Sequence, residues 1–338
     1  MVDSADGPDR STLARLERRL LGGPRTLTLA QLAERVGADE ATVGLFWRAM
    51  GVAATDPDAI AFTDEDARVL GHLIAAARQH DLGRAAAISL VRSAGHLTDR
   101  LALWQAEALV EHLAARYELD DTSARLVLLD RMSELAPLLE EQLVHAWRRQ
   151  MAALAGRFVA EFSAARGVPV DALPLARAVG FADMVSFTTR TAAMPPGELA
   201  GFVQGFEERA RDVVTGAGGR VVKTIGDAVL FVADDVTAGA QVALGLAEAF
   251  GATSTTPVRV GFVWGRVLSR FGDVFGVPVN LAARLTGEAE PGTVLLDDVT
   301  AELLADDARY RLTELAARDV AGLGPVRPVR LEVSPPAR

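Results

Sequence analysis

A short stretch in the second half of the chain decides the fold: Arg220-Val221-Val222-Lys223-Thr224-Ile225-Gly226-Asp227-Ala228-Val229-Leu230-Phe231-Val232. Two runs rich in β-branched residues, 220–224 and 228–232, flank the turn-forming pair Gly226-Asp227, and this pattern predicts a β-hairpin. Lys223 is the single lysine among the 35 lysines and arginines of the chain. A site that needs a compact ammonium would explain its presence, although a solvated surface lysine fits equally well when the residue is taken alone.

Length and charge limit the class of protein. At 338 residues, half of them apolar, the chain is too long for one ordinary core, so we expect two globular domains. The net charge of −10 argues against a protein that neutralises phosphates along a duplex. No apolar run reaches the roughly 18 residues that span a bilayer, and the acidic residues 1–6 are unlike a secretory leader. We therefore expect no membrane association and a cytoplasmic location, which the absence of cysteine permits.

The pattern of apolar residues changes near the middle of the chain. From Ser11 to about Ala165, apolar residues recur at three- and four-residue spacing, which predicts helices. After residues 167–171, a segment with a Gly and a Pro, short β-branched runs alternate with helical patterns. We therefore expect a helical regulatory domain with its linker helix at residues 1–166 and a second domain at residues 167–338.

The second domain is predicted to combine strands and helices. The expected strands are 173–181, 220–224, 228–232, 258–263 and 293–296, and the expected helices are 196–216, 236–250 and 279–288. This β-α-β-β-α-β order with additional elements is the ferredoxin-like or palm arrangement, so the fold class is α+β. All five histidines precede residue 150, and the second domain must therefore carry out its chemistry without histidine.

Two carboxylates mark the ends of predicted strands in this domain. Asp183 follows a buried strand, and Asp227 lies in the hairpin turn. Neighbouring carboxylates of this kind can hold divalent cations against a triphosphate, because Mg²⁺ prefers oxygen ligands. Each residue also has an ordinary alternative, since Asp183 fits a helix N-cap and Asp227 fits a turn position.

A third polar group is expected on one face of a helix. Asn280 and Arg284 are four residues apart, which places both side chains on the same side, while Leu281 and Leu285 bury the neighbouring stripe. An amide and a guanidinium aimed together suit a ribose oxygen and a phosphoryl group. With these three groups in this order, the stretch from about residue 175 to 296 resembles the catalytic domain of class III adenylyl cyclases.

The resemblance implies a reaction and a role for these residues. Asp183 and Asp227 would bind two divalent cations, Mg²⁺ or Mn²⁺. Asn280 would orient the ribose, and Arg284 would stabilise charge on the α-phosphate. The ribose 3′-hydroxyl would then attack the α-phosphorus in line, and ATP would become cyclic AMP and pyrophosphate.

The resemblance also implies the substrate and the assembly. Lys223 would contact adenine and Asp273 would accept a hydrogen bond from its amino group, which favours ATP over GTP. Because cyclases of this class draw each site from two chains, a homodimer with two shared sites is implied. Arg327 occupies the place of a cation that reaches the terminal phosphates, and an exposed arginine fits it equally well. The alternatives are a guanylyl or dual-specificity cyclase, and a regulator with a vestigial cyclase domain.

The helical half points to regulation. Residues 28–48 resemble a helix-turn-helix, but Glu40 and a single Arg48 on its second helix argue against DNA as a partner. The arrangement is similar to actinobacterial cyclases whose helical N-terminal domain senses pH. His72 and His80 are candidate sensors because histidine titrates near neutrality, with ordinary surface histidines as the alternative. A proton or a small ligand is therefore the expected effector, acting through a linker helix near residues 138–162.

Overall fold

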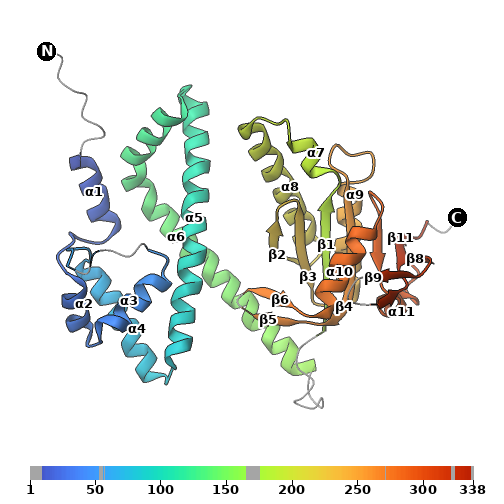
Figure 1. Ribbon diagram of the computed structural model, residues 1–338, viewed down its shortest axis with the longest axis horizontal. Coiled ribbons are helices and arrows are strands. Elements are labelled where there is room, and N and C mark those ends of the chain that lie inside the picture. The colour runs from blue at the N-terminus through green and yellow to red at the C-terminus, as the bar shows by residue number, and fades with distance from the viewer. Residues whose placement is uncertain are drawn as a thin grey trace. The chain divides into compact units, whose positions relative to one another are not determined.

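The computed structural model describes residues 10–52, 56, 58–164, 176–270, 272–320 and 324–335. The chain divides into two compact units, Met1–Arg166 and Gly167–Arg338, one helical and one built on a sheet (Figure 1). The segment 167–171, where we expect the domain boundary, lies outside the described residues. No helix in the described ranges is long and apolar enough to cross a membrane.

The helical unit begins with a small cluster of capped helices. Thr28 starts α2 with a capping box, and Thr63 starts α4 in the same way. Leu32, Val43 and Phe62 form the centre of the core that these helices share. The bounds are Arg10–Leu20 (α1), Leu29–Val36 (α2), Glu40–Ala49 (α3) and Asp64–Gln79 (α4).

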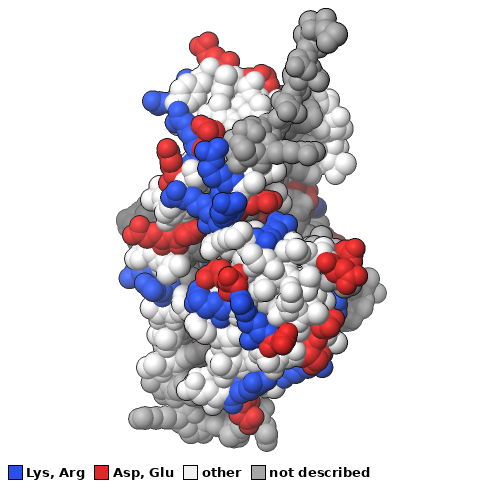
Figure 2. All heavy atoms as spheres, turned by 90° about the vertical axis from the view of Figure 1, so that its left-hand side faces the viewer, with Lys and Arg blue, Asp and Glu red and all other residues white. Residues whose placement is uncertain are grey.

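Helices α2 and α3 form the helix pair that the sequence predicts. Helix α3 has Asp39 as its N-cap, Glu40 in its first turn and Arg48 in its last turn. On the face of the molecule drawn in Figure 2, acidic and basic side chains are interspersed and do not separate into a patch of one sign.

Two long helices complete this unit. They are α5, Arg84–Tyr117, and α6, Asp121–Ala164, and their shared core contains Val110 and Leu128. Glu118 ends α5 in the left-handed conformation at φ 52°. That conformation usually requires glycine, and it turns the chain from one helix into the next.

The second unit contains a seven-stranded sheet in the order β2-β3-β1-β4-β7-β11-β8. Its first four strands are antiparallel neighbours in the ferredoxin-like order, so the predicted fold class is confirmed. The strands are Ala176–Met184 (β1), Arg220–Ile225 (β2), Ala228–Ala233 (β3), Val258–Arg266 (β4), Leu268–Arg270 (β5), Asp273–Phe275 (β6), Val294–Leu296 (β7), Tyr310–Glu314 (β8), Arg318–Val320 (β9), Gly324–Val326 (β10) and Val329–Val333 (β11).

Helices cover both faces of this sheet. Helices α8 and α9 pack on one face through residues such as Phe206 and Leu246, and α10 packs on the other through Leu285. Gly239 allows the close approach of α9, because a Cβ atom there would lie 2.4 Å from the Cβ of Ala178. The helix bounds are Phe187–Thr191 (α7), Pro196–Gly216 (α8), Val236–Ala249 (α9), Val277–Glu288 (α10) and Asp298–Leu304 (α11).

Several predicted boundaries differ from the structure by one to three residues. The first strand ends at Met184 instead of residue 181, and residues 173–175, where its start was expected, lie outside the described ranges. The helix expected from residue 279 begins at Val277, because Pro278 fits the first turn, where its missing N–H is not needed.

Candidate active site

The two predicted metal-binding carboxylates lie on neighbouring strands. Asp183 is near the end of β1, where its register partner on β3 is Ala228, and Asp227 immediately precedes Ala228. The backbone N–H of Met184 donates to the carbonyl of Asp227 over 3.0 Å, which fixes the hairpin turn against β1. The structure therefore brings Asp183 and Asp227 to one corner of the sheet.

This pair of carboxylates fits a divalent cation that is shared with a phosphate. Mg²⁺ is commonly held by one or two carboxylates together with substrate phosphates, and not by a cage made only of protein ligands. The described residues accordingly contain no group of three or more His, Cys, Asp or Glu side chains that could hold a metal ion. The donor set suits a cation that arrives with a nucleotide.

Arg259 is a residue of this corner that the sequence analysis missed. It lies opposite Asp183 on β4, and its Nη2 group forms an ion pair with the Asp183 carboxylate. Its Nη1 group donates to the carbonyl of Gly287 over 3.2 Å, while its buried Nε group has no hydrogen-bond partner among the described residues. A guanidinium with an unused donor, next to two carboxylates, is suited to bind a phosphate oxygen.

The pKa of Asp183 reflects the charges and the burial of this corner. Burial raises the pKa of the Asp183 carboxyl, the hydrogen bond from Arg259 opposes that rise, and the neighbouring charge of Asp227 adds to it. The net effect leaves the pKa above its usual range. An ionised Asp183 therefore costs free energy in the folded protein, as expected of a carboxylate that is kept for binding.

We expect Asp183→Asn to make the metal-free protein more stable at pH 7. Because the pKa is raised on folding, the carboxylate opposes folding above that pKa and has no such effect once it is protonated in both states. The gain, up to about 1 kcal/mol for a partly solvated group, should vanish below the ordinary Asp pKa of about 3.9. Denaturant unfolding with a chelator at both pH values measures it, with the exposed Asp212→Asn as control. Equal stability of the two variants at pH 7 would contradict the prediction.

The two predicted base-binding residues are in direct contact. Lys223 on β2 and Asp273 on β6 are fifty residues apart in sequence, and Lys223 Nζ lies 2.5 Å from Asp273 Oδ2. Burial acts to raise the pKa of the Asp273 carboxyl, but hydrogen bonds from Lys223 and from the N–H of Val274, with the ammonium charge, hold it below its usual range. The pair is half-exposed and therefore accessible to a ligand.

Asn280 and Arg284 lie on the outer face of α10. Both side chains are exposed, while Ala282 and Leu285 face the sheet. Arg284 has no ion pair among the residues that the structure describes. Its guanidinium is therefore available to a bound anion.

Helix α10 runs in the direction opposite to β4. Pro278 at its start packs against Gly265 near the end of β4, and Gly287 at its end accepts a hydrogen bond from Arg259 at the start of β4. Asn280 and Gly287 are seven residues, or about 10 Å, apart along the helix. Within one chain, Asn280 therefore lies toward the opposite end of α10 from the corner with Asp183.

The remaining predicted site residues are on the surface. Arg327 is exposed and follows β10, and it lacks an ion-pair partner within the described ranges, while residues 321–323 of its run lie outside them. His72 is exposed on α4, with Arg68 Nη1 at 3.4 Å from its Nδ1 atom. His80 is exposed and is the C-cap residue of α4, so it is placed just beyond the helix.

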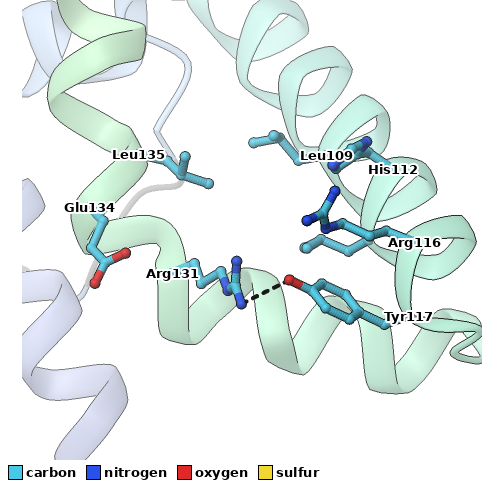
Figure 3. Close-up of a pocket in the computed structure, with 8 residues that line it drawn as sticks. Leu109, His112, Arg116, Tyr117, Arg131, Glu134 and Leu135 are labelled. Carbon is cyan, nitrogen blue, oxygen red and sulfur yellow. Dashed lines mark hydrogen bonds between the residues drawn. The ribbon is translucent and has the colours of Figure 1, made fainter.

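A hollow of about 360 Å³ lies between α5 and α6 in the helical unit (Figure 3). Arg116 and Arg131 both approach the ring of Tyr117, with Cζ atoms 5.7 and 5.4 Å from its centroid. Hydrogen bonds to Arg116 and Arg131 lower the pKa of the Tyr117 hydroxyl. Leu109, Leu113 and Leu135 supply the apolar part of the lining.

The fold and the sequence together identify the second unit. A mixed sheet whose first four strands are antiparallel neighbours in ferredoxin-like order, with helices on both faces, defines a palm-type α+β domain. Residues 176–332 match the family described as the adenylate and guanylate cyclase catalytic domain. The chain belongs to this cyclase family, and the resemblance stated from the sequence is confirmed.

Proteins related to nearly the whole chain carry cyclase names. A protein named adenylate cyclase from Glutamicibacter nicotianae is 42% identical over 95% of this chain and 82% of its own length. One of the same name from Streptomyces coelicolor is 41% identical over 89% of this chain and 78% of its own length. A protein named pH-sensitive adenylate cyclase from Mycobacterium tuberculosis is 33% identical over 86% and 73%. The similarity therefore extends into the helical half.

Proposed function

We propose that this protein is an adenylyl cyclase, which converts ATP to 3′,5′-cyclic AMP and pyrophosphate. The observation that carries the proposal is the contact of Lys223 with Asp273, which places a donor and an acceptor side by side for adenine. An adenine edge offers a ring nitrogen that accepts and an amino group that donates, so the pair complements it. The names of the relatives support the same substrate.

The residues of the corner would bind the triphosphate and its cations. Asp183 and Asp227 would hold two divalent cations, which when bound supply positive charge to the phosphates and acidity to the ribose 3′-hydroxyl. Arg259 would leave its ion pair with Asp183 and donate to a phosphate oxygen. Arg327, on the loop after β10, is a second candidate for the terminal phosphates.

The residues of α10 would act on the reacting atoms. Asn280 would hold the ribose so that its 3′-oxygen faces the α-phosphorus in line with the leaving pyrophosphate. Arg284 would donate to the α-phosphate oxygens as negative charge develops on them during the attack. A new bond then joins the 3′-oxygen to phosphorus, and the bond to the bridging oxygen of pyrophosphate breaks.

We infer a homodimer from the placement of these two groups of residues. Asn280 and Arg284 are exposed on the outer face of α10, which faces away from the sheet, and Asn280 lies toward the end of the helix away from Asp183. One substrate molecule cannot easily meet both groups within one chain. A second chain, related by a two-fold axis, would complete each site and produce two equivalent sites.

The first test is cyclic nucleotide formation by the purified full-length chain. ATP and GTP are supplied separately with Mg²⁺ or Mn²⁺, and cyclic AMP from ATP is the expected product. Formation of cyclic GMP from GTP at an equal or higher rate would support a guanylyl or dual-specificity cyclase instead. The absence of any product between about pH 5.5 and 8 would support a regulator with a vestigial cyclase domain.

We expect the base-binding pair to determine the choice of nucleotide. Lys223→Glu together with Asp273→Ser should lower the kcat/KM for ATP at least about 100-fold, because each polar group of adenine then loses its partner. The kcat/KM for GTP should rise, since Glu can accept from the guanine N–H groups. The comparison uses Arg266→Gln, an exposed change on β4, as a control. A double variant with unchanged ATP preference would exclude these two residues from base recognition.

We further propose that the helical region, residues 1–166, regulates the catalytic domain, residues 167–338. The relatedness to a protein named pH-sensitive supports a proton as effector. The hollow between α5 and α6 is a candidate position for a small anion, because Arg116 and Arg131 have no carboxylate partner in the described part of the chain.

We expect the two candidate histidines to contribute to any pH response. Protonation of His72 and His80 would add positive charge to the surface of α4. Replacing both with Gln should flatten the pH profile of cyclic AMP formation by the full-length chain between about pH 5.5 and 8. His145→Gln, an exposed position on α6, serves as the matched control. A profile that both variants leave unchanged would exclude His72 and His80 as sensors.

A further inference from the structure

The hollow of about 360 Å³ in the helical unit lies within one pair of packed helices (Figure 3). Its lining comes from residues 109–117 of α5 and residues 131–135 of α6. The two helices share a core that contains the buried side chains of Val110 and Leu128, and this core fixes the separation of the two walls. A preformed hollow of this volume is in the range of sites for small molecules.

Two guanidinium groups reach the hollow from its two walls. The Cζ atoms of Arg116 on α5 and Arg131 on α6 lie 5.7 and 5.4 Å from the centroid of the Tyr117 ring. Figure 3 shows both side chains directed into the space between the helices. Neither arginine forms an ion pair in the part of the chain that the structure describes. Because two cations held against one ring repel each other, an anion placed between them lowers the free energy of both.

Tyr117 adds a third donor group. Its hydroxyl oxygen accepts a hydrogen bond from Arg131 Nη2 over 3.1 Å, which leaves its own O–H to donate to a ligand. Hydrogen bonds with Arg116 and Arg131 hold the pKa of this hydroxyl below its usual range, as expected where positive charge collects. Arg116, Arg131 and Tyr117 therefore present three donor groups to the same hollow.

The rest of the lining is mainly apolar. Leu113 is buried, and Leu109 and Leu135 are partly buried. Glu134 is the one carboxylate among the lining residues, and Figure 3 shows it on the side of the hollow away from Arg116. A ligand that fits this lining has an anionic end for the arginines and a compact apolar or aromatic body for the leucines.

We propose that the hollow is a binding site for a phosphate monoester with a compact apolar or aromatic body. Such an ester carries nearly two negative charges at neutral pH, since its second pKa is about 6. Its three terminal oxygens match the three donor groups, whereas a carboxylate has a single charge and two oxygens. Inorganic phosphate would satisfy the arginines but would leave the leucines in contact with water. The inference deepens the regulation proposed for the helical region, and it rests on the proposed function in that respect alone.

Calorimetric titration of the full-length chain with phenyl phosphate, in the presence of a chelator, tests the site. Arg116→Gln and Arg131→Gln should each weaken binding at least about tenfold, because each removes a charged donor to the phosphate. Arg131→Lys keeps the charge but loses the forked guanidinium, so its Kd should lie between those of the parent chain and Arg131→Gln. Arg100→Gln, an exposed change on α5, is the matched control and should bind like the parent chain.

Two further measurements locate the ligand and exclude misfolding. The catalytic unit also carries arginines that suit a phosphate, so Arg284→Gln is titrated as well and should leave the Kd unchanged. Phenyl phosphate should raise the melting temperature of the parent chain and of Arg100→Gln, but not that of Arg116→Gln or Arg131→Gln, because a ligand stabilises only a state that binds it. Both arginines of the hollow are exposed, so each variant should keep the circular dichroism of the parent chain.

Other results would overturn the inference. Benzoate bound as tightly as phenyl phosphate would show a carboxylate site, and inorganic phosphate bound as tightly would show that the leucines do not contribute. Loss of binding in Arg284→Gln alone would place the ligand in the catalytic unit. Co-sedimentation on vesicles that contain phosphatidic acid, without binding of phenyl phosphate, would assign the arginines to a lipid headgroup. Binding by a chain that forms no cyclic AMP supports the site and contradicts the proposed function, whereas cyclic AMP formation without binding does the reverse.

Discussion

Asp227→Asn should lower cyclic AMP formation by the full-length chain at least about 1,000-fold, with either Mg²⁺ or Mn²⁺. Asp227 and Asp183 are the two carboxylates that the described strands bring to the corner of β1, β3 and β4, and Asp183 already shares its charge with Arg259. Removal of the Asp227 charge leaves Asp183 and Arg259 nearly balanced, so the corner no longer attracts a divalent cation.

Two controls separate this effect from misfolding. Asp212→Asn, an exposed change on α8, should keep full activity, and both variants should show the circular dichroism and melting temperature of the parent chain. Because Asp227 is partly exposed in a hairpin turn, we expect Asp227→Asn to change the unfolding free energy of the protein by less than about 1 kcal/mol. An Asp227→Asn chain with more than a tenth of the parent activity would exclude this residue as a cation ligand.

A mixture of two inactive variants is expected to regain activity. Asp227→Ala removes a carboxylate, and Arg284→Ala removes the guanidinium on α10, so each variant alone should be nearly inactive. In a mixed dimer, one site combines the intact Asp227 of one chain with the intact Arg284 of the other. Random association makes about half of the dimers mixed, each with one of two sites intact, so about one quarter of the parent activity should return.

The measurement is cyclic AMP formation after the two proteins are combined, incubated to allow exchange of subunits, and assayed at constant total concentration. Combining Asp227→Ala with Asp183→Ala is the matched control, because both changes affect the same group and every mixed site lacks a carboxylate. If the first mixture stays as inactive as its components while sedimentation shows exchanged dimers, each site belongs to a single chain.

Local patterns allowed much of the catalytic fold to be predicted. The hairpin at residues 220–232 follows from β-branched runs around Gly226-Asp227, and it is observed as β2 and β3. Such pairing depends on neighbours in sequence. The end of β1 was predicted at residue 181 instead of Met184, because the polar Asp183 interrupts the apolar pattern of a buried strand.

Contacts between segments that are distant in sequence limited how much of the site could be predicted. Lys223 and Asp273 were paired through the family resemblance, since nothing in their own sequence brings together residues that are fifty positions apart. Arg259 was missed because a single charged residue between Val258 and Val260 is the normal alternation of a half-buried strand. Only its register opposite Asp183 shows that its side chain points toward the carboxylates.

The surroundings of helix α6 could not be predicted from local sequence either. Pro137 would ordinarily end a helix, yet α6 continues past it for more than twenty residues. The residues that follow were predicted to form a linker helix near residues 138–162. Their exposure appears only once the fold shows that no described element of that domain reaches them.

The placement of Arg259 and Asn280 toward opposite ends of α10 also predicts how mutant alleles would behave in a cell. A chain with Asp227→Ala still provides a working Arg284 to a normal partner, so a mixed dimer keeps one active site and the allele is only partly dominant. A chain with both Asp227→Ala and Arg284→Ala inactivates both sites of every mixed dimer, because each site then lacks either Asp227 or Arg284. Produced beside the normal chain in equal amounts, it should reduce cyclic AMP synthesis per normal chain to about half and, in excess, suppress it almost completely.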